Sequence, residues 1–310
     1  MVLPSVTSHN DLVTAHDATC QGFLEQAKVK TEKASLYIDK GMEFWEELNN
    51  TATISDVLDN PRLREGLIAT AGVSAKARNY LTDEDIKRIL SGIIEGIPED
   101  RKEAFREELF YRYLLTKGAT LDGEMRNYAG AYAARGFVVS LLDVLQTAHD
   151  PSVWLKDVND SLRLPEAKVL AESHKVQKIS WRNRVLLFDK KPAIINKNVD
   201  MILLDASTPQ ADASLLQTHT CYLACGELKG GIDPAVADEH WKTARSALDR
   251  VAEVFAAHDN KPALFFLGRA IEEAMAAELI HWLQSGKLQY AANLTVPQQV
   301  ADLISWLVRL

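Results

Sequence analysis

Apolar residues recur every three or four positions along much of the first 125 residues of the chain. The spacing is clearest from Asp11 to Leu48 and from Asp83 to Tyr113, and it places the apolar side chains on one face of a helix. Thr82 is typical of a helix N-cap, and the acids that follow it favour a first helical turn. Turn-forming residues separate the segments at Asn60-Pro61, at Gly72 and from Gly96 to Pro98. We therefore predict a mainly helical domain over residues 1–125.

The pattern changes beyond this domain. Another helix is expected from Glu124 to Leu145, where small side chains would allow close packing against a sheet or a partner helix. Residues 150–180 are polar and show no clear period. Apolar stretches that indicate buried strands follow at Trp181 to Phe188, Ala193 to Leu204, Tyr222 to Leu228 and Ala263 to Leu267.

Three helices are expected between and after the last strands. They run from Asp233-Pro234 to about His258, from Ile271 to Ser285 and from Pro297 to Leu310. Asp suits the N-cap of the first of these helices and Pro its first helical position. Strands followed by helices in this order predict an α/β catalytic domain over residues 126–310, with a small mixed sheet flanked by helices.

Candidate chemistry is concentrated in the segment Gly226 to Gly231, which closes the third strand. Side chains two positions apart on a strand share a face, so Glu227 and Lys229 would project together. A carboxylate beside an ammonium at a strand end suits a Mg2+-dependent phosphodiesterase. The carboxylate would hold the metal, and the lysine would steady the attacking water or the charge on the phosphate. The same pair is also typical of an ordinary surface ion pair.

Such a site needs at least one more acid, and two candidates precede Glu227. Asp200 and Asp205 begin and end the same apolar run, and their spacing does not decide between them. His240 lies seven residues, or two turns, after Asp233, so both would lie on one face of the expected helix. His240 could accept a proton from the attacking water, or it could be a partly exposed helix histidine. Asp233 suits a helix cap, and its carboxylate could also accept from the amino group of cytosine.

Composition places the chain among soluble globular proteins, with 47% hydrophobic and 25% charged residues. No apolar run reaches about 18 residues, so no membrane span is expected, and the N-terminus lacks a secretory pattern. The three cysteines indicate free thiols in a reducing compartment. The net charge of -8 disfavours a polyanionic partner. Residues 163–197 nevertheless carry nine basic and three acidic side chains, which is compatible with a DNA-facing patch or with a solvated strand face.

Several segments resemble the AvaI/BsoBI family of type II restriction endonucleases. They are Tyr111 to Gly118, Lys197 to Met201, Gly226 to Pro234, Ala237 to Ala244 and Ala291 to Thr295. The block from residue 226 to residue 244 is long and specific, and the matches span most of the chain. One departure is Val236, where the family has a small glycine. The segment 206–220 also differs in length and composition, so no contacts from it carry over.

The resemblance implies a PD-(D/E)XK nuclease core joined to a helical domain, and a homodimer that encircles duplex DNA. It implies Mg2+-dependent cutting of both strands at the palindrome CYCGRG. It identifies Asp200, rather than Asp205, as the catalytic aspartate and metal ligand. Glu227 takes the second metal-ligand position, Lys229 that of the catalytic lysine and His240 that of the general base.

The resemblance also assigns base recognition to Lys197 and Asp233. Their chemistry fits, because a lysine donates to guanine O6 and N7 and an aspartate accepts from cytosine N4. Lys76 and Arg78 are candidates for DNA contacts from the helical domain, although such side chains are more often solvated helix charges.

The implied function is that of a cytoplasmic, Mg2+-dependent restriction endonuclease, with a DNA methyltransferase that protects the host DNA. The alternative is a catalytically silent, sequence-specific DNA-binding protein derived from such a nuclease, which the presence of all four catalytic residues disfavours. A structural helical scaffold with an acidic surface is a third hypothesis, and it would show no salt-sensitive affinity for DNA.

Overall fold

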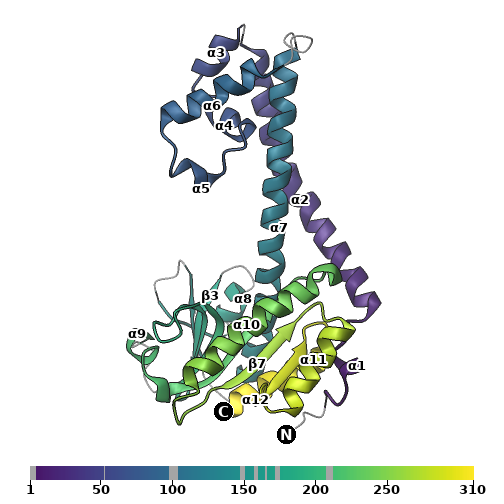
Figure 1. Cartoon of the computed structure of the whole chain (residues 1–310), viewed down its shortest axis with the longest axis vertical. Coiled ribbons are helices and arrows are strands. Elements are labelled where there is room, and N and C mark those ends of the chain that lie inside the picture. The colour runs from purple at the N-terminus through teal and green to yellow at the C-terminus, as the bar shows by residue number, and fades with distance from the viewer. Residues whose placement is uncertain are drawn as a thin grey trace. The chain divides into compact units, whose positions relative to one another are not determined.

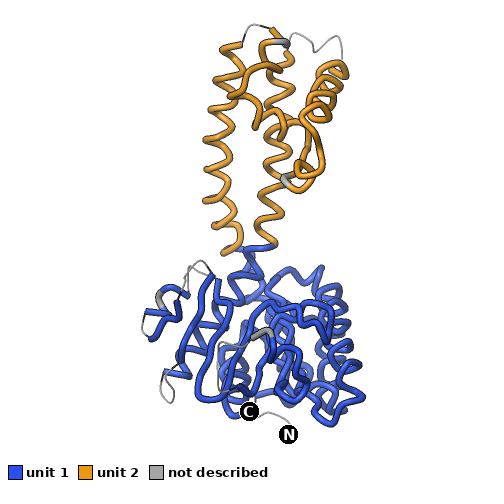
Figure 2. Tube along the Cα trace, turned by 90° about the vertical axis from the view of Figure 1, so that its left-hand side faces the viewer, with its two compact units in different colours: residues 1–24, 127–310 blue, residues 25–126 orange. Residues whose placement is uncertain are grey.

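The computed structural model of the chain describes residues 5–51, 53–97, 104–146, 151–156, 160–164, 166–171, 175–206 and 212–310. The chain divides into two compact units (Figure 2). Unit 1 is made of residues 1–24 and 127–310, and unit 2 is made of residues 25–126.

Unit 1 is built around a mixed sheet that has eight strands within the described residues, in the order β2-β1-β3-β4-β5-β6-β7-β8 (Figure 1). The strands are β1 Ser152–Leu155, β2 Leu162–Arg163, β3 Val176–Trp181, β4 Arg184–Lys190, β5 Val199–Asp205, β6 Tyr222–Lys229, β7 Ala263–Gly268 and β8 Tyr290–Asn293. Neighbouring strands are antiparallel from β2 to β6, whereas β6, β7 and β8 are parallel. The sheet therefore changes its pairing at β6, the strand that carries Glu227 and Lys229.

Helices cover both faces of this sheet. The helices wholly in unit 1 are α1 His9–Leu12, α8 Glu166–Ala171, α9 Asp212–Leu215, α10 Ala237–Phe255, α11 Glu273–Gln284 and α12 Pro297–Arg309, with the short 3-10 helices η2 His219–Cys221 and η3 Pro234–Val236. One face packs against α10 and α11 (Figure 1). The other face packs against α12 and the C-terminal part of α7 Phe105–Gln146. The prediction of an α/β unit with a mixed sheet flanked by helices is confirmed, although the sheet is larger than expected.

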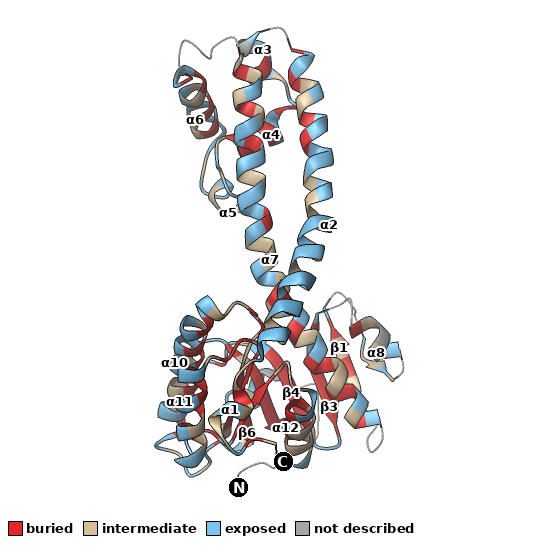
Figure 3. Ribbon diagram, turned by 90° about the vertical axis from the view of Figure 1, so that its right-hand side faces the viewer, coloured by how far each residue is buried: buried red, intermediate tan, exposed pale blue. Residues whose placement is uncertain are grey.

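Successive side chains of β5 point to opposite faces of the sheet, and both sets are apolar. Ile202 and Leu204 point into the core that contains Trp241 of α10, whereas Met201 and Leu203 point into the core that contains Leu141 of α7. All four strand side chains are buried. Because both faces are covered, the strand is a continuous apolar run. Figure 3 shows that much of the sheet is buried.

Unit 2 is helical. It contains α3 Ile54–Asp59, α4 Arg64–Thr70, α5 Ala75–Arg78 and α6 Asp83–Glu95, together with most of α2 His16–Asn49 and the N-terminal half of α7. Its apolar core includes Phe44, Leu67 and Leu109. The predicted helix start at Thr82 is confirmed, since the Thr82 hydroxyl accepts from Asp85 N and the Asp85 carboxylate accepts from Thr82 N. Pro98, which was expected to mark a helix end, lies outside the described residues.

The compact units differ from the predicted domains at the N-terminus, because the first 24 residues belong to unit 1. Leu12 is fully buried in the core beneath α10 and α11. The buried Asn293 side chain donates to Leu12 O at 2.8 Å and to Thr14 Oγ1 at 2.9 Å. Thr14 N donates to Ile271 O at 2.9 Å. These contacts join the N-terminal segment to the far end of the chain. The division after Arg126 lies next to the boundary expected near residue 125.

One described helix, α7, is long and apolar enough to cross a membrane by length and composition. Core helices of soluble proteins meet the same criterion, so this observation is weak support for a membrane span. Apolar residues Phe137, Leu141 and Leu145 of α7 are buried against the sheet. The prediction that the chain does not span a membrane stays a prediction.

Candidate active site

Three charged side chains meet where β5 and β6 lie side by side. Lys229 Nζ donates to Glu227 Oε2 at 2.7 Å and to Asp200 Oδ2 at 3.2 Å. Leu228 N also donates to Asp200 Oδ2, at 2.9 Å. Glu227 is only 3% exposed, so its carboxylate is held in the protein interior next to a single ammonium group.

Antiparallel register explains how Asp200 reaches this position. Met201 pairs with Gly226, which brings the start of β5 beside the end of β6. Asp205, the alternative acid, lies at the opposite end of β5. Its carboxylate accepts from Arg184 Nη1 at 2.8 Å and from Asn183 Nδ2 at 3.0 Å. Asp205 therefore has a structural pairing of its own, and Asp200 is the aspartate that lies beside Glu227.

The electrostatics of the cluster are those of two acids that share one cation. Burial and the negative charge of Asp200 raise the pKa of Glu227 from 4.5 to about 7, against the opposing effect of Lys229. Burial disfavours the charged form of Lys229, but the Glu227 and Asp200 carboxylates outweigh that effect and raise its pKa above the ordinary value. Near neutral pH, Lys229 is therefore charged, and Glu227 is protonated in a substantial fraction of molecules.

The donor set fits a Mg2+ ion. Mg2+ prefers oxygen ligands, and proteins commonly bind it through one or two carboxylates while water and substrate phosphate complete the coordination. Asp200 and Glu227 supply two such carboxylates, and a divalent cation would relieve the repulsion between them. Within the described residues no group of three His, Cys, Asp or Glu side chains could hold a metal. Further ligands would have to be water, backbone or phosphate oxygens.

His240 lies in the first turn of α10, and its ring packs against the Gly231 backbone. A Cβ atom on Gly231 would lie 2.6 Å from His240 Cε1, so only glycine leaves room for the ring. Burial and the positive charge of Lys229 lower the pKa of His240. The imidazole is therefore neutral near pH 7 and able to accept a proton.

The expectation that Asp233 and His240 share one helix face is wrong. Asp233 caps the 3-10 helix η3, where its Oδ1 accepts from Ala235 N at 2.9 Å. Val236 then has non-helical dihedral angles, φ −111° and ψ 4°, and α10 begins after it. The two residues thus lie on different elements, and a spacing of seven residues no longer measures two turns.

Lys197 lies at the mouth of the same cluster. It follows a turn in which Asn196 N donates to Pro192 O at 2.8 Å, with Asn196 at φ 55°. Lys197 is exposed, and it lines an open cavity of about 590 Å³ together with Asp200, Glu227 and Lys229.

The remaining DNA-contact candidates lie in unit 2. Lys76 and Arg78 belong to the four-residue helix α5, and both are exposed. Arg78 Nη1 pairs with Glu65 Oε1 at 2.5 Å. The basic stretch 163–197 is also partly neutralised by neighbouring acids, because Lys168, Lys175 and Arg184 pair with Asp143, Asp189 and Asp205.

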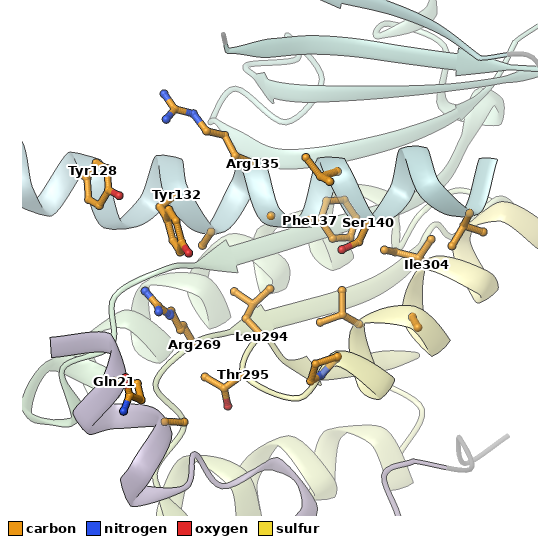
Figure 4. A pocket seen from close by; sticks show the side chains of 18 residues that line it. Gln21, Tyr128, Tyr132, Arg135, Phe137, Ser140, Arg269, Leu294, Thr295 and Ile304 are labelled. Atoms are coloured by element: carbon orange, nitrogen blue, oxygen red, sulfur yellow. The ribbon is translucent and has the colours of Figure 1, made fainter. Parts of the chain in front are cut away.

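A cavity of about 830 Å³ in unit 1 has none of the predicted site residues in its lining (Figure 4). Apolar residues of α7 and α12 form much of its lining, and the Arg269 guanidinium lies 5.3 Å from the centre of the Tyr132 ring. Arg135 points away from this cavity in Figure 4. A second cavity, of about 540 Å³, has Arg135, Asp200 and Lys229 in its lining.

The sequence patterns did not single out several residues around the cluster. Gly230 lies against α7, where an added Cβ would be 2.5 Å from Ala129 O, so the small residues of α7 lie beside the site. Thr243, Ser246 and Arg250 of α10 line the 590 Å³ cavity with the carboxylates. These residues follow His240 in successive steps of three, three and four residues, and this helical spacing is the signal that could have identified them.

Comparison with known proteins gives a consistent result over almost the whole chain. The family model described as restriction endonuclease BsoBI matches residues 4–310. The type II restriction enzyme AvaI of Nostoc sp. is 38% identical over 310 residues, which cover 98% of each chain, and AvaI of Anabaena variabilis matches equally. The type II restriction enzyme BsoBI of Geobacillus stearothermophilus is 36% identical over 315 residues, covering 98% of this chain and 96% of that enzyme. The resemblance found in the sequence is thereby confirmed, and the chain belongs to the BsoBI family of restriction endonucleases.

Proposed function

We propose that this chain is a Mg2+-dependent type II restriction endonuclease that cuts both strands of duplex DNA at the palindrome CYCGRG. The observation that carries the proposal is the cluster of Asp200, Glu227 and Lys229 on two neighbouring strands, in a chain of a restriction endonuclease family. The β5–β6 region with its flanking helices would be the PD-(D/E)XK core.

Asp200 and Glu227 would hold the metal ion. When bound, Mg2+ supplies positive charge that stabilises the developing charge on the phosphate and favours deprotonation of the attacking water. The raised pKa of Glu227 supports this role, because a buried carboxylate that keeps its proton to about pH 7 lacks a sufficient positive partner.

Lys229 and His240 would supply the two remaining catalytic functions. The Lys229 ammonium stays charged and is fixed by two hydrogen bonds, so it can orient water or stabilise the phosphate in the transition state. His240 has a lowered pKa and is therefore the neutral group suited to take the proton of the water.

Base recognition would fall to Lys197 and Asp233. Lys197 is exposed beside the metal-binding carboxylates, in reach of a bound duplex. The cap hydrogen bond of Asp233 uses Oδ1 and leaves Oδ2 to accept from a cytosine amino group. Lys76 is the stronger of the two candidates in unit 2, because Arg78 is paired with Glu65.

The oligomeric state and the partner enzyme follow from the palindromic site and from the cutting of both strands. A two-fold site cut on both strands calls for a homodimer with one active site for each strand. Unit 2 would help the dimer to encircle DNA. The enzyme would act in the cytoplasm beside a DNA methyltransferase that protects the host sites.

The test is a digest of a long DNA of known sequence, once with Mg2+ and once with EDTA, followed by sequencing of the ends. Ends that map to CYCGRG and form only with Mg2+ are expected. Ends at another palindrome would retain the nuclease but overturn the roles of Lys197 and Asp233 as readers of CYCGRG. An absence of new ends, with DNA binding retained, would favour the alternative of a catalytically silent DNA-binding protein.

A further inference from the structure

The 590 Å³ cavity extends beyond the catalytic cluster along one side of α10. One wall is formed by Lys197 and Asn198, which precede β5. The other wall is formed by Thr243, Ser246 and Arg250, whose spacing places them on one face of α10. Arg250 lies ten residues after His240, so it is about 15 Å further along the helix axis. The cavity is therefore long enough to hold more of a ligand than the group that reacts.

Arg250 differs from the other cations of the same helix. Lys242 pairs with Asp238 at 2.5 Å, and Arg245 pairs with Glu278 at 2.7 Å. Arg250 is half-buried, and it makes no ion pair with any described residue. A guanidinium group carries five donors, and those of Arg250 are available on the cavity wall.

No described acid forms an ion pair with Arg250, although Glu253, three residues later, lines a neighbouring surface cavity with it. Asp249, its neighbour in sequence, is bound to Lys287 at 2.6 Å. Glu239 also lines the cavity, but it lies eleven residues, about 16 Å of helix, before Arg250. Asp249 and Glu253 do not line the 590 Å³ cavity, so Arg250 is the charged side chain at this end of it, whereas the carboxylates of Asp200 and Glu227 lie at the other end.

We propose that Arg250, assisted by the hydroxyl group of Ser246, binds a backbone phosphate of the DNA strand that is cut. The Thr243 hydroxyl donates to Glu239 O at 2.9 Å and so belongs to the helix rather than to this subsite. This inference rests on the proposed function and adds a phosphate subsite next to the scissile phosphate. Guanidinium binds phosphate oxygens in a bidentate manner, and Ser and Thr hydroxyls are common donors to DNA phosphates. The subsite would hold the strand in register with Asp200 and Glu227 without contributing to base recognition.

The test measures binding of two short duplexes, one with a CYCGRG site and one without, in EDTA over a range of salt concentrations. Arg250→Gln should weaken binding of both duplexes by roughly tenfold, the effect of losing a charge-assisted hydrogen bond. It should also reduce the slope of log affinity against log salt by about 1. Arg250→Lys keeps the charge and should keep the salt slope. Arg245→Gln is the matched control, because Arg245 already pairs with Glu278, and it should bind as the wild type does.

The outcomes separate this inference from the proposed function. Wild-type affinity and salt slope in Arg250→Gln would overturn the phosphate subsite alone, and so would a loss confined to the CYCGRG duplex, which indicates a base contact. A salt slope reduced equally in Arg250→Lys would overturn it too, since that variant retains the charge. A wild-type protein that binds neither duplex would overturn both proposals. Thermal unfolding of each variant identifies any loss of affinity that comes from misfolding.

Discussion

Lys229 keeps two acids together at the end of β6. Without its ammonium, Asp200 and the buried Glu227 would face each other with no positive charge between them. When two neighbouring carboxylates are both ionised, their negative charges repel each other. This repulsion raises the pKa of one of them, so that it takes up a proton. The same side chain therefore has a structural role and, by our proposal, a catalytic one, and these roles respond differently to mutation.

Lys229→Ala should reduce the cleavage rate by at least about a hundredfold, because it removes the charge that faces the reacting phosphate. Binding of a duplex with the CYCGRG site should remain measurable, since the proposed base contacts come from other residues. Single-turnover cleavage and a binding assay on the same preparation test this expectation. Lys261→Ala, which changes an exposed lysine before β7, is the control. Wild-type cleavage by Lys229→Ala would refute the catalytic role.

Glu227 gives the metal-free protein a characteristic dependence of stability on pH. The folded protein holds this proton to about pH 7, whereas the unfolded chain releases it near pH 4.5. Between these values the folded state binds more protons, so the free energy of unfolding falls as pH rises from 4.5 to 7. A shift of this size corresponds to about 3 kcal/mol at most.

Glu227→Gln removes this titration. In EDTA, the variant should be more stable than the wild type at pH 8, and the difference should shrink as the pH falls from 7 to below 4.5, where wild-type Glu227 is protonated in both states. Urea unfolding across this pH range measures the difference. Parallel curves for the two proteins would show that Glu227 is not the titrating group.

The connection from β6 to α10 is the element that brings His240 to the cluster. Gly231 carries no side chain at the point where the imidazole lies against the backbone. Gly231→Ala would place a Cβ 2.6 Å from His240 Cε1 and force the ring to turn. If His240 is the general base, cleavage should fall by roughly tenfold or more while DNA affinity stays unchanged. Gly136→Ala, at a helical glycine with open space around it, is the control. Unchanged cleavage by Gly231→Ala would remove His240 from the proposed mechanism.

Elements with strong periodicity were predictable from the sequence, and those without it were not. The helices α10, α11 and α12 and the strands β5, β6 and β7 follow long apolar patterns. The strands β1, β2 and β8 have only two to four residues, which is too short for a period to show. The helix expected from Glu124 to Leu145 is the C-terminal part of the longer helix α7, which begins at Phe105 and ends at Gln146.

Only part of the candidate site was predictable from the sequence. Glu227 and Lys229 share a strand, so their relation follows from alternation alone. The choice between Asp200 and Asp205 depends on the register of β5 against β6, which a single sequence does not encode locally. Asp233 and His240 were wrongly joined into one helix, because the non-helical dihedral angles at Val236 leave no mark on the apolar pattern.

At the scale of the whole molecule, one chain holds one cluster of Asp200, Glu227 and Lys229. A palindrome presents two equivalent scissile phosphates, one on each strand, related by a two-fold axis. A single cluster would have to release and rebind the duplex to cut both strands, whereas a two-fold dimer presents one cluster to each. We therefore expect a particle of twice the 34.5 kDa chain mass in sedimentation at micromolar concentration. On a plasmid with one CYCGRG site, linear product should form without accumulation of nicked circles. A particle of single-chain mass that accumulates nicked circles would instead show that each strand is cut in a separate binding event.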